Sequence, residues 1–148
     1  MMMTIGPKKT PWVKAMDFLA RRDHSEKELR EKLARDYDDD EIETTIQEVK
    51  ERGWLLPPEE LSEKVTNELH RKRKGHLYIL NFLRQKGLPE VPKNPEIEME
   101  KALQILESKM KDPGDTQRTV SLLKNRGFDT ETITRVLHEI RRNSPSIY

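Results

Sequence analysis

The chain has 148 residues with 28 basic and 27 acidic side chains, so its formal net charge is only +1. Its composition of 33% hydrophobic, 5% aromatic and 37% charged residues offers little apolar material for one large core and predicts several small ones. The absence of cysteine excludes disulfides and thiolate metal sites. No apolar run approaches the roughly 20 residues that span a bilayer, and the start lacks a signal-peptide core. We expect a cytoplasmic protein without membrane segments.

Residues 1–14 hold two prolines and three lysines without a regular period, which predicts a flexible basic arm. Three short helices are expected in residues 15–56. Ser25 with Glu28, and Asp38 with Glu41, have the three-residue spacing of capping boxes, and Gly53 ends the third helix. The apolar positions expected in the shared core recur at helical spacing: Ala15, Phe18, Leu19, Leu29, Leu33, Ile42, Ile46 and Val49.

Residues 57–98 and 99–142 are predicted to repeat this arrangement, and we expect residues 143–148 to be a C-terminal tail. Pro57 and Pro58 suit the start of a helix in the middle copy. Pro89, Pro92 and Pro95 interrupt that copy where its third helix should begin, so we expect this helix to be shortened or displaced. The apolar faces predicted for the two copies contain Leu61, Val65, Leu69, Ile79, Leu83, Ala102, Leu103, Leu106, Val120, Leu123, Ile133, Leu137 and Ile140, with Asp129 preceding the last helix.

These elements predict an all-α fold of three tandem three-helix repeats that form an elongated, curved body. The alternative is two helical hairpins joined at PEVPKNP.

Charge is segregated along the chain although its total is near zero. Residues 15–56 carry 8 basic and 13 acidic side chains, whereas residues 61–88 carry 7 basic and 2 acidic ones. A polyanion is the natural partner for the basic segment, because each neutralised phosphate releases condensed counterions. The alternative is a solvated helix face. The candidate nucleic-acid or filament-binding residues are Arg71, Lys72, Arg73, Lys74, His76, Tyr78, Arg84 and Lys86, of which His76 and Tyr78 would hydrogen-bond to or stack on a base.

Catalytic motifs are missing from the sequence. It has no glycine-rich phosphate loop, no HExxH motif and no nucleophile elbow. No two histidines have the i, i+4 spacing of metal ligands on one helix; they are His24, His70, His76 and His138. The acidic run DDDE lies directly before a series of apolar residues at helical spacing, which is the position of a helix cap. We predict no active site, no metal and no cofactor, and therefore a protein that is not an enzyme.

Two stretches together resemble the RecX family, whose members regulate the RecA recombinase. The first is AMDFLARRDHSEKELREKLARDYDDDEIETTIQEVKERGWL. The second is KGHLYILNFLRQKGL, which matches the family pattern K-G-x-x-x-I-x-x-x-L-R-Q-K-G through Lys74, Gly75, Ile79, Leu83, Arg84, Gln85, Lys86 and Gly87. The resemblance covers about residues 15–142. Departures from the family are Leu77 and Tyr78, where basic residues are frequent, the segment PPEELSEK, and the three prolines between residues 89 and 95.

The resemblance implies a monomeric, non-enzymatic regulator that binds RecA filaments on single-stranded DNA. It implies effects, mainly negative, on ATP hydrolysis, strand exchange and co-protease activity, and hence a role in homologous recombination, DNA repair and the SOS response. We expect the acidic first repeat to contact protein and the basic second repeat to contact DNA weakly and electrostatically. The competing hypothesis is a stand-alone helical DNA-binding protein or helix-turn-helix regulator.

Overall fold

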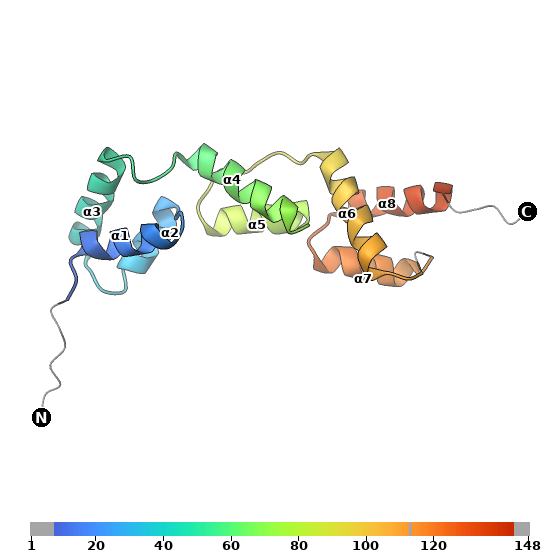
Figure 1. The fold of residues 1–148 in the computed structure, drawn as a ribbon, viewed down its shortest axis with the longest axis horizontal. Coiled ribbons are helices and arrows are strands. Elements are labelled where there is room, and N and C mark those ends of the chain that lie inside the picture. Colours follow the sequence, from blue (N-terminus) through green and yellow to red (C-terminus); the bar gives the residue numbers. More distant parts are fainter. Residues whose placement is uncertain (1–7, 113, 144–148) are drawn as a thin grey trace, which may run out of the picture. The chain divides into compact units, whose positions relative to one another are not determined.

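The computed structural model describes residues 8–112 and 114–143, and these residues contain eight helices and no strand (Figure 1). The all-α prediction is therefore confirmed. Contacts divide the described chain into two compact units. Unit 1 comprises residues 8–61 together with 86–88, and unit 2 comprises residues 62–85 together with 89–112 and 114–143. None of the helices in the described ranges is long and apolar enough to cross a membrane.

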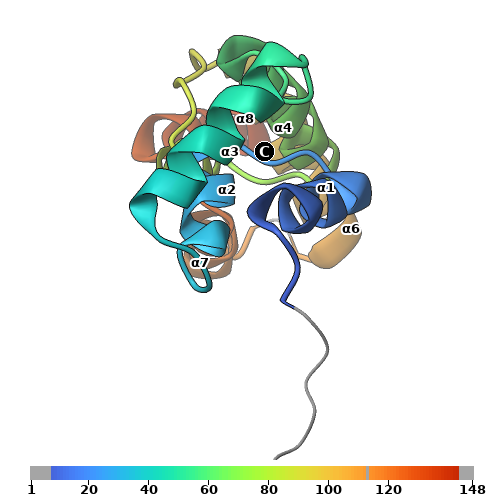
Figure 2. The same cartoon turned by 90° about the vertical axis from the view of Figure 1, so that its left-hand side faces the viewer.

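Unit 1 is built from α1 (Pro11–Arg21), α2 (Glu26–Leu33) and α3 (Asp39–Glu51), which cross one another closely (Figure 2). The two predicted capping boxes are present: the backbone N–H of Glu28 donates to Ser25 Oγ, and that of Glu41 donates to Asp38 Oδ1, at 3.1 and 2.8 Å. Gly53 follows α3 with a φ of +69°, as expected for a helix-ending glycine.

The first helix begins earlier than the predicted arm allows. Thr10 caps α1 by accepting the backbone N–H of Val13, and Pro11 occupies its first turn, where a missing N–H has no cost. Residues 11–14 are therefore helical, whereas residues 1–7 of the predicted arm and residues 144–148 of the predicted tail lie outside the described residues.

Two apolar cores match the repeated pattern. The first lies among α1–α3 and buries Ala15, Leu29, Leu33, Ile42, Ile46 and Val49. The second lies among α6 (Pro95–Lys109), α7 (Thr116–Asn125) and α8 (Thr130–Asn143) and buries Ala102, Ile105, Leu106, Met110, Leu123, Phe128, Ile133 and Val136. One predicted core position is wrong: Leu103 is 36% exposed. The buried stripe of α6 runs through residues 98, 101, 102, 105 and 106 instead.

The middle of the chain forms a pair of helices, α4 (Pro58–Arg71) and α5 (His76–Gln85). Leu69, Ile79 and Leu83 are buried, as the periodicity predicts.

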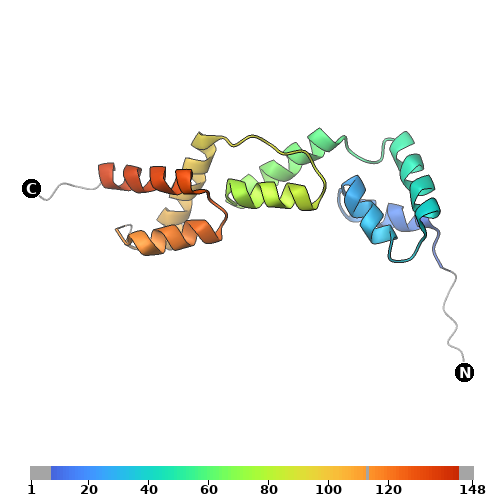
Figure 3. The ribbon, with the colours of Figure 1, turned by 180° about the vertical axis from the view of Figure 1, so that it is seen from behind.

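No helix follows α5 until α6, and the extended connection of residues 86–94 is visible in Figure 3. The third helix of the middle repeat is thus absent, because Pro89 and Pro92 remove backbone donors where it would form. The connection is held by side chains: Ser62 Oγ donates to the Pro89 carbonyl at 2.8 Å, and Lys93 Nζ lies 2.9 Å from Asp129 Oδ2. The elongated, curved body and the repeat boundaries stay predictions, for which small-angle scattering and limited proteolysis are the tests.

Candidate nucleic-acid interface

The turn between α4 and α5 in unit 2 carries the four consecutive cations predicted from the sequence. Arg71, Lys72 and Arg73 are exposed. Arg71 lies 2.7 Å and Lys72 3.9 Å from the carboxylate of Glu68, so one acid serves two cations. Arg73 adopts a left-handed conformation with a φ of +58°, which closes the turn. The turn therefore keeps an excess of positive charge on its surface.

A buried ion pair on α6 holds this turn from inside unit 2. Lys101 Nζ lies 2.5 Å from Glu98 Oε2, and the side chains of both residues are at most 5% exposed. The Lys101 ammonium also donates to the Lys74 carbonyl at 2.6 Å and to His70 Nδ1 at 2.9 Å. The Glu98 carboxylate in turn accepts the backbone N–H of His76 at 2.7 Å. The pair thus fixes the backbone on both sides of Gly75.

Two glycines let the start of α5 press against the turn before α8. Gly75 N donates to the Arg126 carbonyl at 2.8 Å, and Leu77 N donates to the Gly127 carbonyl at 2.9 Å. A Cβ on Gly75 would lie 2.3 Å from the Gly127 carbonyl carbon, closer than any packed contact. Gly75 is therefore required for this approach, and the cationic turn is a docked, ordered structure.

Aromatic side chains continue the surface of the turn along α5. The Lys74 ammonium lies 4.8 Å from the centre of the Tyr78 ring, which is exposed. Tyr78 stacks with Phe82, with ring centroids 6.4 Å apart and an interplanar angle of 23°. A cation beside accessible rings is the combination that binds single-stranded nucleic acid, since phosphates pair with the cations and bases stack on the rings.

The two histidines of the turn are neutral near pH 7. Burial lowers the pKa of His76, against the opposing charge of Glu98. Burial and then the neighbouring Lys101 charge lower the pKa of His70. Burial likewise lowers the pKa of Lys101. The neighbouring Glu98 carboxylate acts in the opposite direction and offsets part of this lowering. His76 therefore adds no positive charge to this surface at neutral pH.

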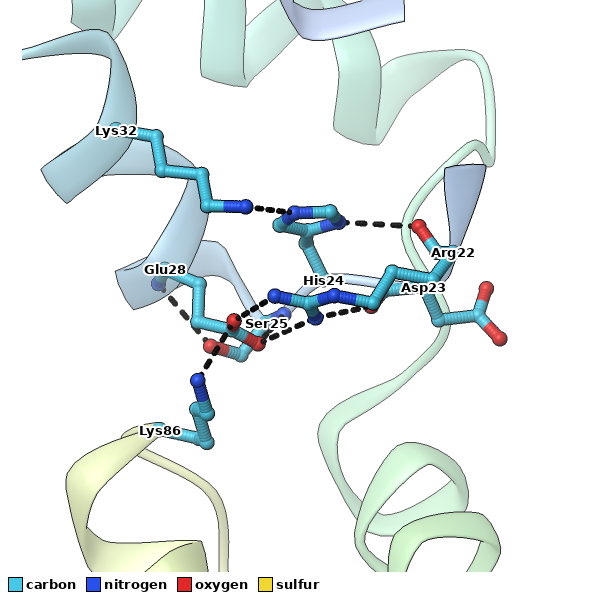
Figure 4. A network of polar contacts seen from close by, with 7 residues as sticks. All are labelled: Arg22, Asp23, His24, Ser25, Glu28, Lys32 and Lys86. Carbon is cyan, nitrogen blue, oxygen red and sulfur yellow. Dashed lines mark hydrogen bonds and ion pairs between the residues drawn. The ribbon is translucent and has the colours of Figure 1, made fainter. Parts of the chain in front are cut away.

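Arg84 and Lys86, both candidate binding residues, have different surroundings. The Arg84 side chain is 65% exposed and pairs with Glu90 at 2.8 Å in unit 2. Lys86, which belongs to unit 1, is 27% exposed and lies 2.9 Å from the buried Glu28 carboxylate (Figure 4). Lys86 is therefore half-buried beside Glu28, because a buried carboxylate requires a counter-charge.

Glu28 is the centre of a polar network in unit 1 (Figure 4). Its carboxylate accepts Arg22 Nη2 at 2.8 Å, and its Oε1 accepts the Ser25 backbone N–H at 3.2 Å. Burial by itself raises the pKa of Glu28, but the bonds from Arg22, Lys86 and Ser25 outweigh it and lower the pKa to about 2. Glu28 is therefore ionised at every physiological pH.

The cationic turn was predicted from the sequence, but the buried charged residues that hold it were not. Glu98, Lys101 and Glu28 were not among the candidates, although Glu98 and Lys101 share the buried stripe of α6 with Ala102 and Ile105. A charged pair on an apolar stripe was the available signal. Among the described residues, no three His, Cys, Asp or Glu side chains gather where they would hold a metal ion.

Comparison with known proteins decides the family. The model of the first three-helix domain of RecX matches residues 12–48, which cover most of α1, all of α2 and most of α3. The regulatory protein RecX of Prosthecochloris aestuarii is 30% identical over 141 residues, covering 88% of this chain and 93% of the relative. The chain belongs to the RecX family.

Two solved RecX structures share the fold. The crystal structure of RecX from Lactobacillus salivarius aligns with a TM-score of 0.72 at 18% identity, covering 89% of this chain and 95% of the other. A second crystal structure of a regulatory protein RecX aligns with a TM-score of 0.67 at 19% identity, covering 85% and 70%. In the RecX-like motif of this chain, Ile79 and Leu83 are core residues and Gly75 is a packing residue, so much of the motif specifies the fold.

Proposed function

We propose that this RecX-family protein is a non-catalytic modulator of RecA that binds RecA filaments on single-stranded DNA. Family membership over 88% of the chain carries the proposal. The modulation is mainly negative, on ATP hydrolysis, strand exchange and co-protease activity, as the family resemblance implies.

The cationic turn of unit 2 is the part that contacts DNA in this proposal. Glu68 pairs with both Arg71 and Lys72, so this one acid leaves most of the charge of the turn available to phosphates. The buried Glu98–Lys101 pair holds the turn in one conformation, which reduces the entropy lost when it binds. Tyr78 and Phe82 extend the surface with rings for unstacked bases.

Binding measurements on three substrates test the proposal. Affinity is measured by fluorescence anisotropy for free single-stranded DNA and for duplex DNA, and by co-sedimentation for RecA filaments. We expect the protein to bind RecA filaments more tightly than either free DNA. We also expect it to bind duplex DNA without a preferred sequence. A variant with Ala at residues 71–74 should bind single-stranded DNA more weakly, and its binding should depend less on salt. The slope of log affinity against log salt concentration should become shallower by about 0.7 for each lost phosphate contact.

The matched control also removes four cations from unit 2, at the exposed positions Lys109, Lys111, Lys124 and Arg141, each replaced by Ala. Equal loss in both variants would show that net charge alone governs DNA binding. A preferred duplex sequence, with no preference for filaments, would instead identify a DNA-binding regulator and contradict the proposal.

A further inference from the structure

A pair of tryptophans lies on the surface of unit 1, where the segment after α3 meets the start of α1. Trp54 is 54% exposed and is the most exposed large hydrophobic residue among those that the structure describes. Its ring meets that of Trp12 edge to face, with centroids 6.3 Å apart and an interplanar angle of 64°. The Arg52 guanidinium lies 4.9 Å from the centre of the Trp12 ring. Tryptophan and arginine are residue types that dominate the binding energy of protein interfaces.

The end of α3 fixes the backbone around Trp54. Gly53 has a φ of +69°, and its N–H donates to the Lys50 carbonyl at 3.0 Å. The N–H of Trp54 donates to the Val49 carbonyl at 3.1 Å. In this Schellman arrangement the residue after the glycine usually packs its apolar side chain onto the last turn of the helix. Trp54 leaves more than half of its surface to water instead, so its ring is held in place and remains accessible to a partner.

The charge of α3 disfavours nucleic acid as the ligand of this pair. The helix and its cap, DDDEIETTIQEVKE, contain seven acidic side chains and one basic side chain. Glu51 is exposed three residues before Trp54, and Glu48 accepts the Arg52 guanidinium at 3.0 Å. A phosphate backbone drawn to the tryptophans would therefore meet like charge. This differs from the turn of unit 2, where the Tyr78 ring lies beside the Lys74 ammonium.

The basic residues before α1 have contacts elsewhere in unit 1. Lys9 Nζ lies 2.7 Å from Asp17 Oδ2. The Lys8 ammonium lies 4.4 Å from the centre of the Tyr37 ring, and Tyr37 precedes the start of α3, whereas Trp54 follows its end. The surroundings of Trp54 are thus set mainly by the acidic helix from which it extends.

We propose that Trp54, supported by Trp12, is the anchor through which unit 1 docks on a protein surface that offers an apolar pocket bordered by basic side chains. The inference deepens the proposed function and rests on it, and the partner is then the protein of the filament. A tryptophan in a pocket supplies the apolar centre that a protein interface needs, and a basic border matches the acids of α3. Unit 1 thus recognises the protein of the filament, and the cationic turn of unit 2 recognises its DNA.

Truncating the anchor in the full chain tests the proposal. Trp54→Ala should lower the affinity for RecA filaments at least about tenfold in co-sedimentation, because such anchors dominate the binding energy. Its affinity for free single-stranded DNA, measured by fluorescence anisotropy, should change by less than about twofold, since phosphate contacts determine that affinity. Leu103→Ala is the matched control, because it truncates another exposed apolar side chain, in unit 2. This control should bind filaments as the wild type does.

Reversing a charge beside the ring tests the chemistry of the partner. At about 0.1 M salt, where surface charges are only partly screened, Glu51→Lys should weaken filament binding about threefold, because it opposes the basic border of the pocket. Glu107→Lys makes the same change at an exposed position of unit 2 and should not weaken binding. If Glu51→Lys strengthens filament binding more than Glu107→Lys does, the surface faces phosphates and the proposal is overturned.

The remaining outcomes separate this inference from the proposed function. If the wild type binds filaments and Trp54→Ala binds them equally well, the anchor alone is refuted. If Trp54→Ala loses affinity for filaments and for free DNA by the same factor, Trp54 stacks on bases and is not a protein anchor. If the wild type does not bind filaments at all, the proposed function fails and the anchor fails with it. Circular dichroism verifies folding, and if Trp54→Ala does not fold, the comparison of Glu51→Lys with Glu107→Lys decides.

Discussion

Replacing Lys101 by Met removes the cation from the buried pair beneath the cationic turn while keeping a similar shape. Glu98 is 1% exposed and would keep the His76 backbone N–H as a donor to its carboxylate after losing the Lys101 ammonium. The Lys74 carbonyl and His70 Nδ1 would each lose a donor. Because a buried charge is left without its counter-ion, we expect the free energy of unfolding of unit 2 to fall by about 4 kcal/mol. This is a large part of the roughly 5–15 kcal/mol that stabilises a typical domain.

Urea unfolding followed by circular dichroism measures the loss, and tryptophan emission provides an internal reference because Trp12 and Trp54 both lie in unit 1. The variant Glu98→Gln/Lys101→Met removes both charges and leaves the net charge unchanged, so it should lose only about 1 kcal/mol. A loss below about 1 kcal/mol for Lys101→Met alone would refute the reasoning. It would mean that Glu98 is solvated and that the turn is not held from α6.

Three further predictions concern single positions. Gly75→Ala should cost at least about 2 kcal/mol in unfolding free energy, because its Cβ would meet the Gly127 backbone at 2.3 Å, and a wild-type melting temperature would contradict the close approach. Acid titration should remove about 3 kcal/mol of stability as pH falls from about 4.5 to about 2, since Glu28 has its lowered pKa only in the folded state; Glu28→Gln should flatten that part of the curve, and an unchanged curve would count against the network. Lys86→Glu should destabilise the protein by about 3 kcal/mol in urea unfolding, whereas Arg84→Glu should change the same measurement by less than about 1 kcal/mol, and equal effects would show that Lys86 is not part of the network.

Local hydrogen bonding made much of the fold predictable. Ser25 with Glu28 and Asp38 with Glu41 are three residues apart, so their sequence spacing determines whether they can cap a helix. The apolar stripes of α2 and α3 were also predictable, because they follow from the spacing of apolar residues within one helix. The prolines that prevent a helix after α5 likewise act on the backbone beside them.

The supports of the candidate interface were not predictable in this way. The hydrogen bond from the His76 backbone N–H to Glu98 joins residues that are 22 positions apart in the sequence. The bond from Lys101 to the Lys74 carbonyl joins residues that are 27 positions apart. Glu98 and Lys101 have the i, i+3 spacing of an ordinary surface ion pair on a helix. Their burial can be predicted only because they lie on the same buried face of α6 as Ala102. The ion pair of Lys86 was not predictable for the same reason, because its partner Glu28 lies 58 residues away in the sequence.

ATP hydrolysis by preformed RecA filaments tests the central proposal most directly. The protein is titrated into filaments at a salt concentration where it no longer binds free single-stranded DNA, since screening weakens charge contacts but leaves apolar and hydrogen-bonded protein contacts in place. A RecX-type modulator should lower the hydrolysis rate in a saturable manner under these conditions. An unchanged rate at saturating protein, with the protein folded, would contradict the account.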